Sequence, residues 1–156
     1  MSRDKTEIGF LEKWDLPFSN ELWPSVSVII PPDSTGRVKV VVMPEGLGRY
    51  PGYLLEFDAA PFVMVYDETC APRPISEWFE MLKTIPKSSA IIWHDSPLVK
   101  QYAGIGAISF LHRIENPTLK HYMISGGDSI VEILAYLEPS VVQFDKPQKI
   151  LIEYSF

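Results

Sequence analysis

Residues 120–142, KHYMISGGDSIVEILAYLEPSVV, decide more of the fold than any other stretch of this chain. The first six, Lys120–Ser125, alternate between two faces with the period of a strand: His121, Met123 and Ser125 on one, Tyr122 and Ile124 on the other. Gly126 and Gly127 follow, and glycine reaches backbone conformations closed to other residues. The sequence therefore predicts a strand that ends in a tight turn.

A helix is the expected continuation from residue 129. Ser129 and Glu132 have the S-x-x-E spacing of a capping box, and Asp128 is an alternative N-cap. An apolar stripe at helical spacing follows, made of Ile130, Ile133, Leu134 and Leu137. Pro139 ends the predicted helix, and a second strand begins near residue 141.

Short apolar segments separated by proline and glycine turns make up the rest of the chain. The expected strands are residues 26–30, 37–43, 53–57, 62–66, 90–93, 107–114 and 149–156. Hairpins are predicted for 26–30 with 37–43, for 53–57 with 62–66, and for 107–114 with 120–125. The strand 62–66 is apolar almost throughout, which favours a central position covered on both faces.

Two helices are expected besides the one after residue 129. The first carries an apolar stripe from Ile75 to Ile85 between Pro74 and Pro86. The second begins at Ser96-Pro97, an N-cap followed by a proline in the first helical position.

Together these segments predict an α+β fold: a mostly antiparallel sheet of eight or nine short strands with two or three helices packed on it. At 156 residues the chain is expected to form a single domain, 1–156. Residues 1–24 are too apolar for a disordered tail, so we expect an N-terminal arm packed on the body as loop or short helix.

Composition excludes several classes of function. Fourteen basic and 20 acidic residues give a net charge of −6, whereas nucleic-acid binding needs a concentrated basic surface. No apolar run approaches the roughly 20 residues that span a bilayer, and the start MSRDKTEIGF lacks the core of a secretory signal. Cys70 is the single cysteine, so a disulfide framework is excluded. A cytoplasmic protein with no nucleic-acid or membrane partner is expected.

The residues that could carry chemistry are scattered. Cys70 lies in a loop without an oxyanion-hole signature, and His94 and Asp95 are adjacent, so on a strand they diverge. The histidines His94, His112 and His121 lack metal-ligand spacing, although His112 and His121 could meet across a hairpin. We therefore expect no catalytic residue, no metal and no cofactor.

Two further features could hold ions but have ordinary explanations. Asp67 and Glu68, with Glu56 and Asp58 nearby, could form a carboxylate cluster, but acids at strand ends are usually solvated. Residues 125–129 precede the predicted helix N-terminus, yet Asp128 would repel an anion there.

Aromatic and charged side chains at the ends of elements are the better candidates for binding. Interfaces favour Trp, Tyr and Arg anchors. The predicted interface residues are Trp23, Arg49, Tyr50, Tyr53, Trp93, Asp67 and Glu68.

The order of segments over residues 52–142 resembles that of small bacterial α+β proteins of the immunity-protein type. The shared features are Tyr53-Leu54-Leu55-Glu56-Phe57, Val65-Tyr66-Asp67-Glu68, Trp78, Ser96-Pro97-Leu98, His121-Tyr122-Met123-Ile124, Asp128–Ala135 and Glu138-Pro139. The resemblance implies a non-catalytic protein-binding domain, such as an inhibitor of a bacterial toxin. A basic protein partner is expected from the net charge of −6. It carries over no catalytic residue.

Two alternatives stay open. A small-molecule-binding protein or enzyme would hold its ligand between sheet and helices, using a subset of His94, His112, His121, Glu68 and Cys70. A homodimer would instead form through the C-terminal strand, residues 149–156, at a sheet edge.

Overall fold

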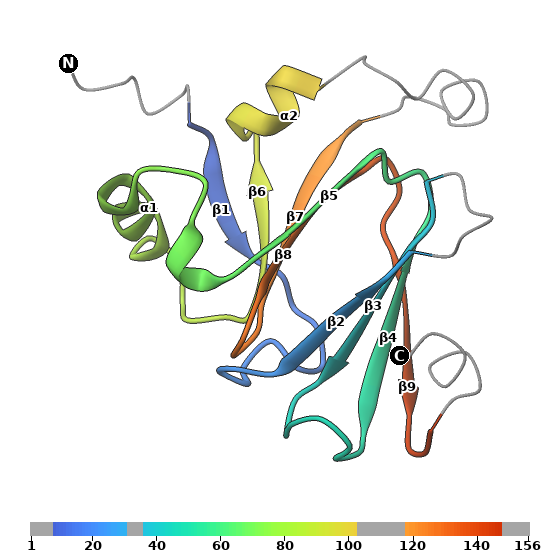
Figure 1. The fold of residues 1–156 in the computed structure, drawn as a ribbon. Coiled ribbons are helices and arrows are strands. Elements are labelled where there is room, and N and C mark those ends of the chain that lie inside the picture. Colours follow the sequence, from blue (N-terminus) through green and yellow to red (C-terminus); the bar gives the residue numbers. More distant parts are fainter. Residues whose placement is uncertain (1–7, 31–35, 103–117, 148–156) are drawn as a thin grey trace.

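The computed structural model describes residues 8–30, 36–102 and 118–147, which form an α+β fold with nine strands and two α-helices (Figure 1). The strands are β1 (Phe10–Lys13), β2 (Ser25–Ile29), β3 (Val38–Met43), β4 (Gly52–Phe57), β5 (Phe62–Tyr66), β6 (Ala90–His94), β7 (Lys120–Ser125), β8 (Ile130–Ala135) and β9 (Ser140–Phe144). The helices are α1 (Ile75–Leu82) and α2 (Pro97–Tyr102), and Glu68–Cys70 forms one 3-10 turn. The predicted fold class is confirmed.

The strands form two sheets rather than one. The first sheet has the order β1-β6-β7-β8-β5 and the second the order β2-β3-β4-β9, and every described pairing is antiparallel. The main core lies between them, where Tyr122, Ile124 and Ile133 of the first sheet meet Val40 and Leu55 of the second. The aromatic ring of Phe57 packs on that of Tyr122 at 5.5 Å between centroids.

The other face of the first sheet carries the two helices, which lie away from the second sheet (Figure 1). Side chains of α1 pack on the cluster of Leu11, Ile91, Trp93 and Met123. Those of α2 pack on a second cluster that contains Leu119 and Leu134. The molecule is therefore a helix layer on a sheet, with a second sheet on the opposite side.

The helix predicted after residue 129 is wrong, because residues 130–135 form strand β8. The Gly126 N–H donates to the Ser129 C=O at 2.8 Å and closes a hairpin with β7. Val131 and Ile133 point into the core between the sheets, while Glu132 is buried on the helix-covered face. The capping spacing is a local signal, and pairing with both β7 and β5 outweighs it.

The predicted hairpin of 53–57 with 62–66 is also wrong. Strand β4 belongs to the second sheet, whereas β5 pairs with β8 at the edge of the first. The connection between them is anchored at its buried centre, where the Ala60 N–H donates to the Gly36 C=O and the Ala59 C=O accepts from the Tyr136 N–H, while Asp58 and Pro61 are exposed. Strand β5 is consequently half exposed, with Val65 at 51%, and not the central strand that its composition predicted.

The hairpin of β2 with β3, the buried strand β6 and the helices α1 and α2 agree with the sequence. The N-terminal arm holds strand β1 paired with β6, not the expected loop or short helix, and its Phe18 is fully buried in the core.

Residues 107–114 and 149–156 lie outside the described residues. The two neighbours of β7 are β6 and β8. In the described part of the chain no helix is long and apolar enough to cross a bilayer.

Candidate functional site

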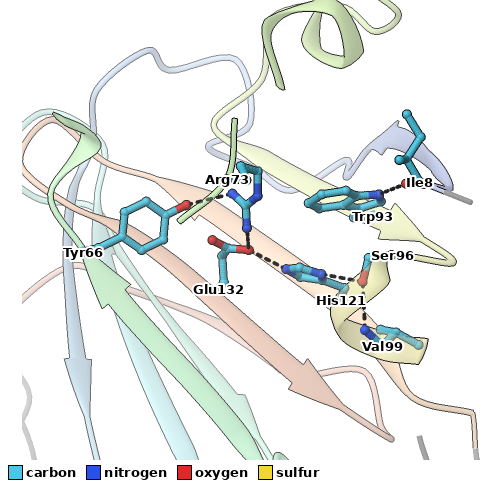
Figure 2. Close-up of polar contacts among 8 residues, drawn as sticks. All are labelled: Ile8, Tyr66, Arg73, Trp93, Ser96, Val99, His121 and Glu132. Atoms are coloured by element: carbon cyan, nitrogen blue, oxygen red, sulfur yellow. Dashed lines mark hydrogen bonds and ion pairs between the residues drawn. The ribbon is translucent and has the colours of Figure 1, made fainter. Parts of the chain in front are cut away.

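A chain of hydrogen bonds is buried between the first sheet and the helices (Figure 2). Glu132 of β8 and His121 of β7 lie on the same face of the sheet and are fully buried. The Nε2 atom of His121 lies 2.7 Å from Glu132 Oε1, and its Nδ1 atom lies 2.8 Å from the Ser96 hydroxyl. Ser96, at the start of α2, is also fully buried.

The partners define the proton positions in this chain. The Val99 N–H donates to Ser96 Oγ at 3.1 Å, as an N-cap requires. The Ser96 hydroxyl is then left to donate to Nδ1 of His121, and Nε2–H of the imidazole donates to the carboxylate of Glu132. Both ring nitrogens of His121 and the Ser96 hydroxyl thus have partners, whereas Oε2 of Glu132 is buried without a hydrogen-bond partner among the described residues.

Arg73 reaches the same carboxylate from the segment that precedes α1. Its Nη2 atom lies 2.5 Å from Glu132 Oε1, and its Nη1 donates to the Tyr66 hydroxyl at 3.1 Å. The guanidinium carbon lies 5.0 Å and 5.1 Å from the ring centroids of Trp78 and Trp93. Arg73 thus ties α1 to both the sheet and its edge strand β5.

The charges of this cluster are balanced in the interior. Burial by itself raises the pKa of Glu132, but the hydrogen bond from His121 and the charge of Arg73 outweigh burial and hold this pKa below its ordinary value of 4.5. Burial raises the pKa of Tyr66, and the neighbouring Glu132 raises it further. Glu132 is therefore a carboxylate beside a neutral phenol and a cationic guanidinium at neutral pH.

Serine, histidine and glutamate in this order have the composition of a nucleophilic triad. A nucleophile must reach a substrate carbonyl, however, and both Ser96 and His121 have no exposed surface. The Ser96 oxygen is also occupied as the N-cap of α2. The arrangement therefore fixes α2 on the sheet and is not an accessible active site.

The surface beside α1 carries several exposed apolar side chains. Of the eight residues of α1, all of them described, none is buried, and Ile75 and Phe79 are each 56% exposed. Across from them, Leu22 and Trp23 are 47% and 77% exposed. A groove of about 480 Å³ runs between them. We call Leu22, Trp23, Ile75 and Phe79 the α1 face.

Trp23 has a backbone φ of 105°, a region that disfavours residues with side chains. The loop that holds it is anchored, because the Gly127 N–H donates to the Pro24 C=O at 2.9 Å. A Cβ at Gly126 would lie 2.8 Å from that same carbonyl oxygen. The glycine turn that the sequence indicated therefore supports the exposed tryptophan.

Two further hollows flank the opposite side of α1. One, of about 320 Å³, lies between α1, α2 and the first sheet and is lined by residues that include Arg73, Trp78 and Trp93. The other, of about 900 Å³, runs between α1 and the start of β1.

The predicted interface residues fall into three places. Trp23, Asp67 and Glu68 are exposed, and Asp67 caps the 3-10 turn through a bond from the Thr69 N–H. Arg49 is exposed on the loop between β3 and β4, while the rings of Tyr50 and Tyr53 pack on Phe144 and Phe18. Trp93 is buried, with its Nε1–H donating to the Ile8 C=O, so it is not a surface anchor. Only Trp23 and Glu68 of these seven line the groove beside the α1 face.

The residues considered for chemistry do not converge within the described part of the chain. His94 bonds Glu12 at 2.7 Å on the sheet face opposite to His121, and Cys70 is exposed. His112 lies outside the described residues. Among the described residues, no three His, Cys, Asp or Glu side chains lie close enough together to hold a metal ion.

Sequence reasoning missed Arg73, Tyr66 and Ser96 as partners of the buried cluster, and it read Glu132 as a helix cap. One signal was available: Glu132 is the single charged residue in the otherwise apolar run Ile130–Leu134. A charge inside a buried strand needs a partner of opposite charge. Arg73 lies 59 residues from Glu132 in the sequence, so local patterns could not identify it as that partner.

No protein-family model, no curated protein and no solved structure matches this chain.

Proposed function

We propose that this chain is a non-catalytic protein-binding domain that binds its partner through the α1 face. The observation that carries the proposal is Trp23, which is 77% exposed although its backbone is held at a φ of 105°. Such strain costs on the order of 1–3 kcal/mol and persists where the surrounding structure enforces it, often at functional sites. An indole exposed to solvent contributes little to the stability of the fold. Binding of a partner is therefore the better explanation for the strained backbone that holds Trp23 at the surface.

The shape and composition of the surface support the same conclusion. Tryptophan and phenylalanine are frequent interface anchors, and Phe79 faces the groove from α1 opposite Trp23. Contiguous exposed apolar surface marks interaction sites in soluble proteins. An amphipathic helix without one buried residue gains further burial when a partner covers it.

The buried cluster supports the absence of catalysis. Its serine and histidine are inaccessible, and each of their polar atoms already has a structural partner. Within the described chain, the hydrogen bonds of this buried cluster thus hold the helices on the first sheet.

The more specific form of the proposal is an immunity-like inhibitor that covers a bacterial toxin. It rests on the resemblance over residues 52–142 and on the net charge of −6, which would complement a basic partner. In this form the chain acts in the cytoplasm of the producing cell.

The test is purification of the tagged chain from its native host at native abundance. A specific partner should accompany the wild type and be lost from the double variant W23A/F79A. The control L47A removes a side chain that is 81% exposed on the loop between β3 and β4 and should retain the partner. Calorimetry with the identified partner then measures affinity. A wild-type chain that stays alone, or equal retention by both variants, overturns the proposal.

A second candidate function is small-molecule binding in the hollow of about 320 Å³ between the first sheet and the helices. Its walls include Trp78 and Trp93, whose indoles would report a ligand by fluorescence. Apolar pockets with a few polar groups are common ligand sites. A saturable fluorescence change with a metabolite library, abolished in W78L, would favour this function. An unchanged spectrum across the library would reject it.

A further inference from the structure

Strand β1 has an open edge among the described residues. It pairs with β6 on one side and ends the order of the first sheet. The Trp14 N–H donates to the Ala90 C=O. Hydrogen bonding alternates along an antiparallel strand, so the backbone N–H and C=O groups of Glu12 and Phe10 also point to β6. The backbone N–H and C=O groups of Leu11 and Lys13 therefore point away from the sheet.

A groove of about 900 Å³ runs along this edge. One wall is Ile8–Leu11, and the other is a continuous stripe of α1 and the turn after it, formed by Ser76, Glu77, Glu80, Met81 and Thr84. The groove thus offers backbone hydrogen-bonding groups on one side and an apolar floor. This is the geometry that strand addition by an extended peptide requires.

The charged residues that the structure describes in the lining are all acidic. They are Glu77, Glu80 and Asp95, and no lysine or arginine of residues 8–30, 36–102 and 118–147 lines the groove. Lys83 bonds Glu80 at 2.9 Å, but both side chains are more than 70% exposed, and such pairs contribute little. An approaching cation can therefore replace Lys83 without a large cost.

We infer that the edge of β1 binds an extended segment of the protein partner in which basic and apolar residues alternate. Its backbone pairs with Leu11 and Lys13, its basic side chains meet Glu77 and Glu80 on the α1 side, and its apolar side chains lie on the opposite face beside Phe10. The inference rests on the proposed function, since it presupposes a protein partner. It adds the conformation and charge of the bound segment.

The test uses an acetylated eight-residue peptide in which lysine alternates with valine, titrated against the full chain at low salt. We expect saturable binding and slowed amide hydrogen exchange at Leu11 and Lys13. The E77K/E80K variant should bind at least about tenfold more weakly, because like charges now face each other. The control E45K/D145K makes the same charge change at the far end of the second sheet and should bind within about twofold.

Backbone methylation separates strand addition from simple charge attraction. Two versions of the peptide carry N-methyl groups at odd or at even positions, and only one set should abolish binding, since a strand pairs through alternate residues. Equal binding by E77K/E80K, absence of protection at Leu11 and Lys13, or no binding of the lysine peptide would each overturn the inference. Those results would not bear on whether binding of the native partner depends on Trp23. The proposed function is therefore tested separately.

Discussion

Arg73 and Glu132, which lie 59 residues apart in the sequence, form an ion pair of 2.5 Å in the interior between α1 and the first sheet. The carboxylate has no exposed surface, and the guanidinium side chain is 15% exposed. The same carboxylate oxygen accepts from His121, so one atom holds groups from the segment before α1 and from β7. Both helices depend on this atom, because His121 also bonds the N-cap of α2.

Removal of Glu132 should therefore destabilise the whole helix layer. We expect E132A to lower the free energy of unfolding by about 3–5 kcal/mol, since the Arg73 charge is left buried without its partner. Urea unfolding followed by circular dichroism measures the change. The exposed control E45A should stay within about 0.5 kcal/mol of the wild type. A comparable loss in both variants would contradict a specific role for the ion pair.

Arg73 should not be replaceable by lysine. A lysine ammonium cannot bridge the Tyr66 hydroxyl and Glu132 while stacking on two indoles, so R73K should cost about 1–3 kcal/mol. The matched control is R37K, where Arg37 faces Asp58 with 71% of its side chain exposed. That change should fall within about 0.5 kcal/mol. Equal stability of R73K and wild type in urea would show that geometry is unimportant here.

The pH dependence of stability should contain a contribution from Glu132. Its pKa in the folded chain lies below the ordinary value of 4.5, so its stabilisation is fully present above pH 4.5 and is lost as pH falls through the folded pKa. Urea unfolding of wild type and E132Q at pH 7, 5 and 3 should thus show a difference that shrinks toward acid. A difference that stays constant over this range would count against the assignment.

Gly126 should tolerate no side chain. A Cβ there would lie 2.8 Å from the Pro24 carbonyl oxygen and 2.9 Å from a methyl carbon of Val26, so G126A should destabilise by about 1–3 kcal/mol. Gly127 is the natural control, because its Cβ would meet nothing closer than 3.5 Å. Thermal unfolding of the two variants should separate them by several degrees. Indistinguishable melting temperatures would disprove the close approach.

Trp23 should be dispensable for folding but not for binding. In W23G the positive φ no longer carries strain, so the free energy of unfolding should stay within about 1 kcal/mol of the wild type or rise. Affinity for the protein partner should fall at least about tenfold, as expected for loss of an anchor. Paired urea and calorimetric titrations measure both quantities. A variant that unfolds easily and binds normally would reverse this assignment.

Local pattern was sufficient to predict most strands and both helices. The alternation in Lys120–Ser125, the apolar run Ala90–Trp93 and the Ser96-Pro97 start each involve neighbours in sequence, so they were visible without the fold. Trp23 was also among the predicted interface residues, because it is an aromatic residue at the end of an element. Its backbone strain was not predicted, because φ depends on the glycine turn that holds the loop.

The sequence by itself determined the mixed antiparallel class, the chain's acidic charge and the segments that form its elements. Only the tertiary structure decided that Ile130–Ala135 is a strand, that β4 and β5 separate into two sheets, and that Arg73, Glu132, His121 and Ser96 meet. The physical reason is the range of the interactions. Periodicity and caps act within a few residues, whereas strand pairing and the neutralisation of a buried charge are settled by groups that only the folded chain brings together.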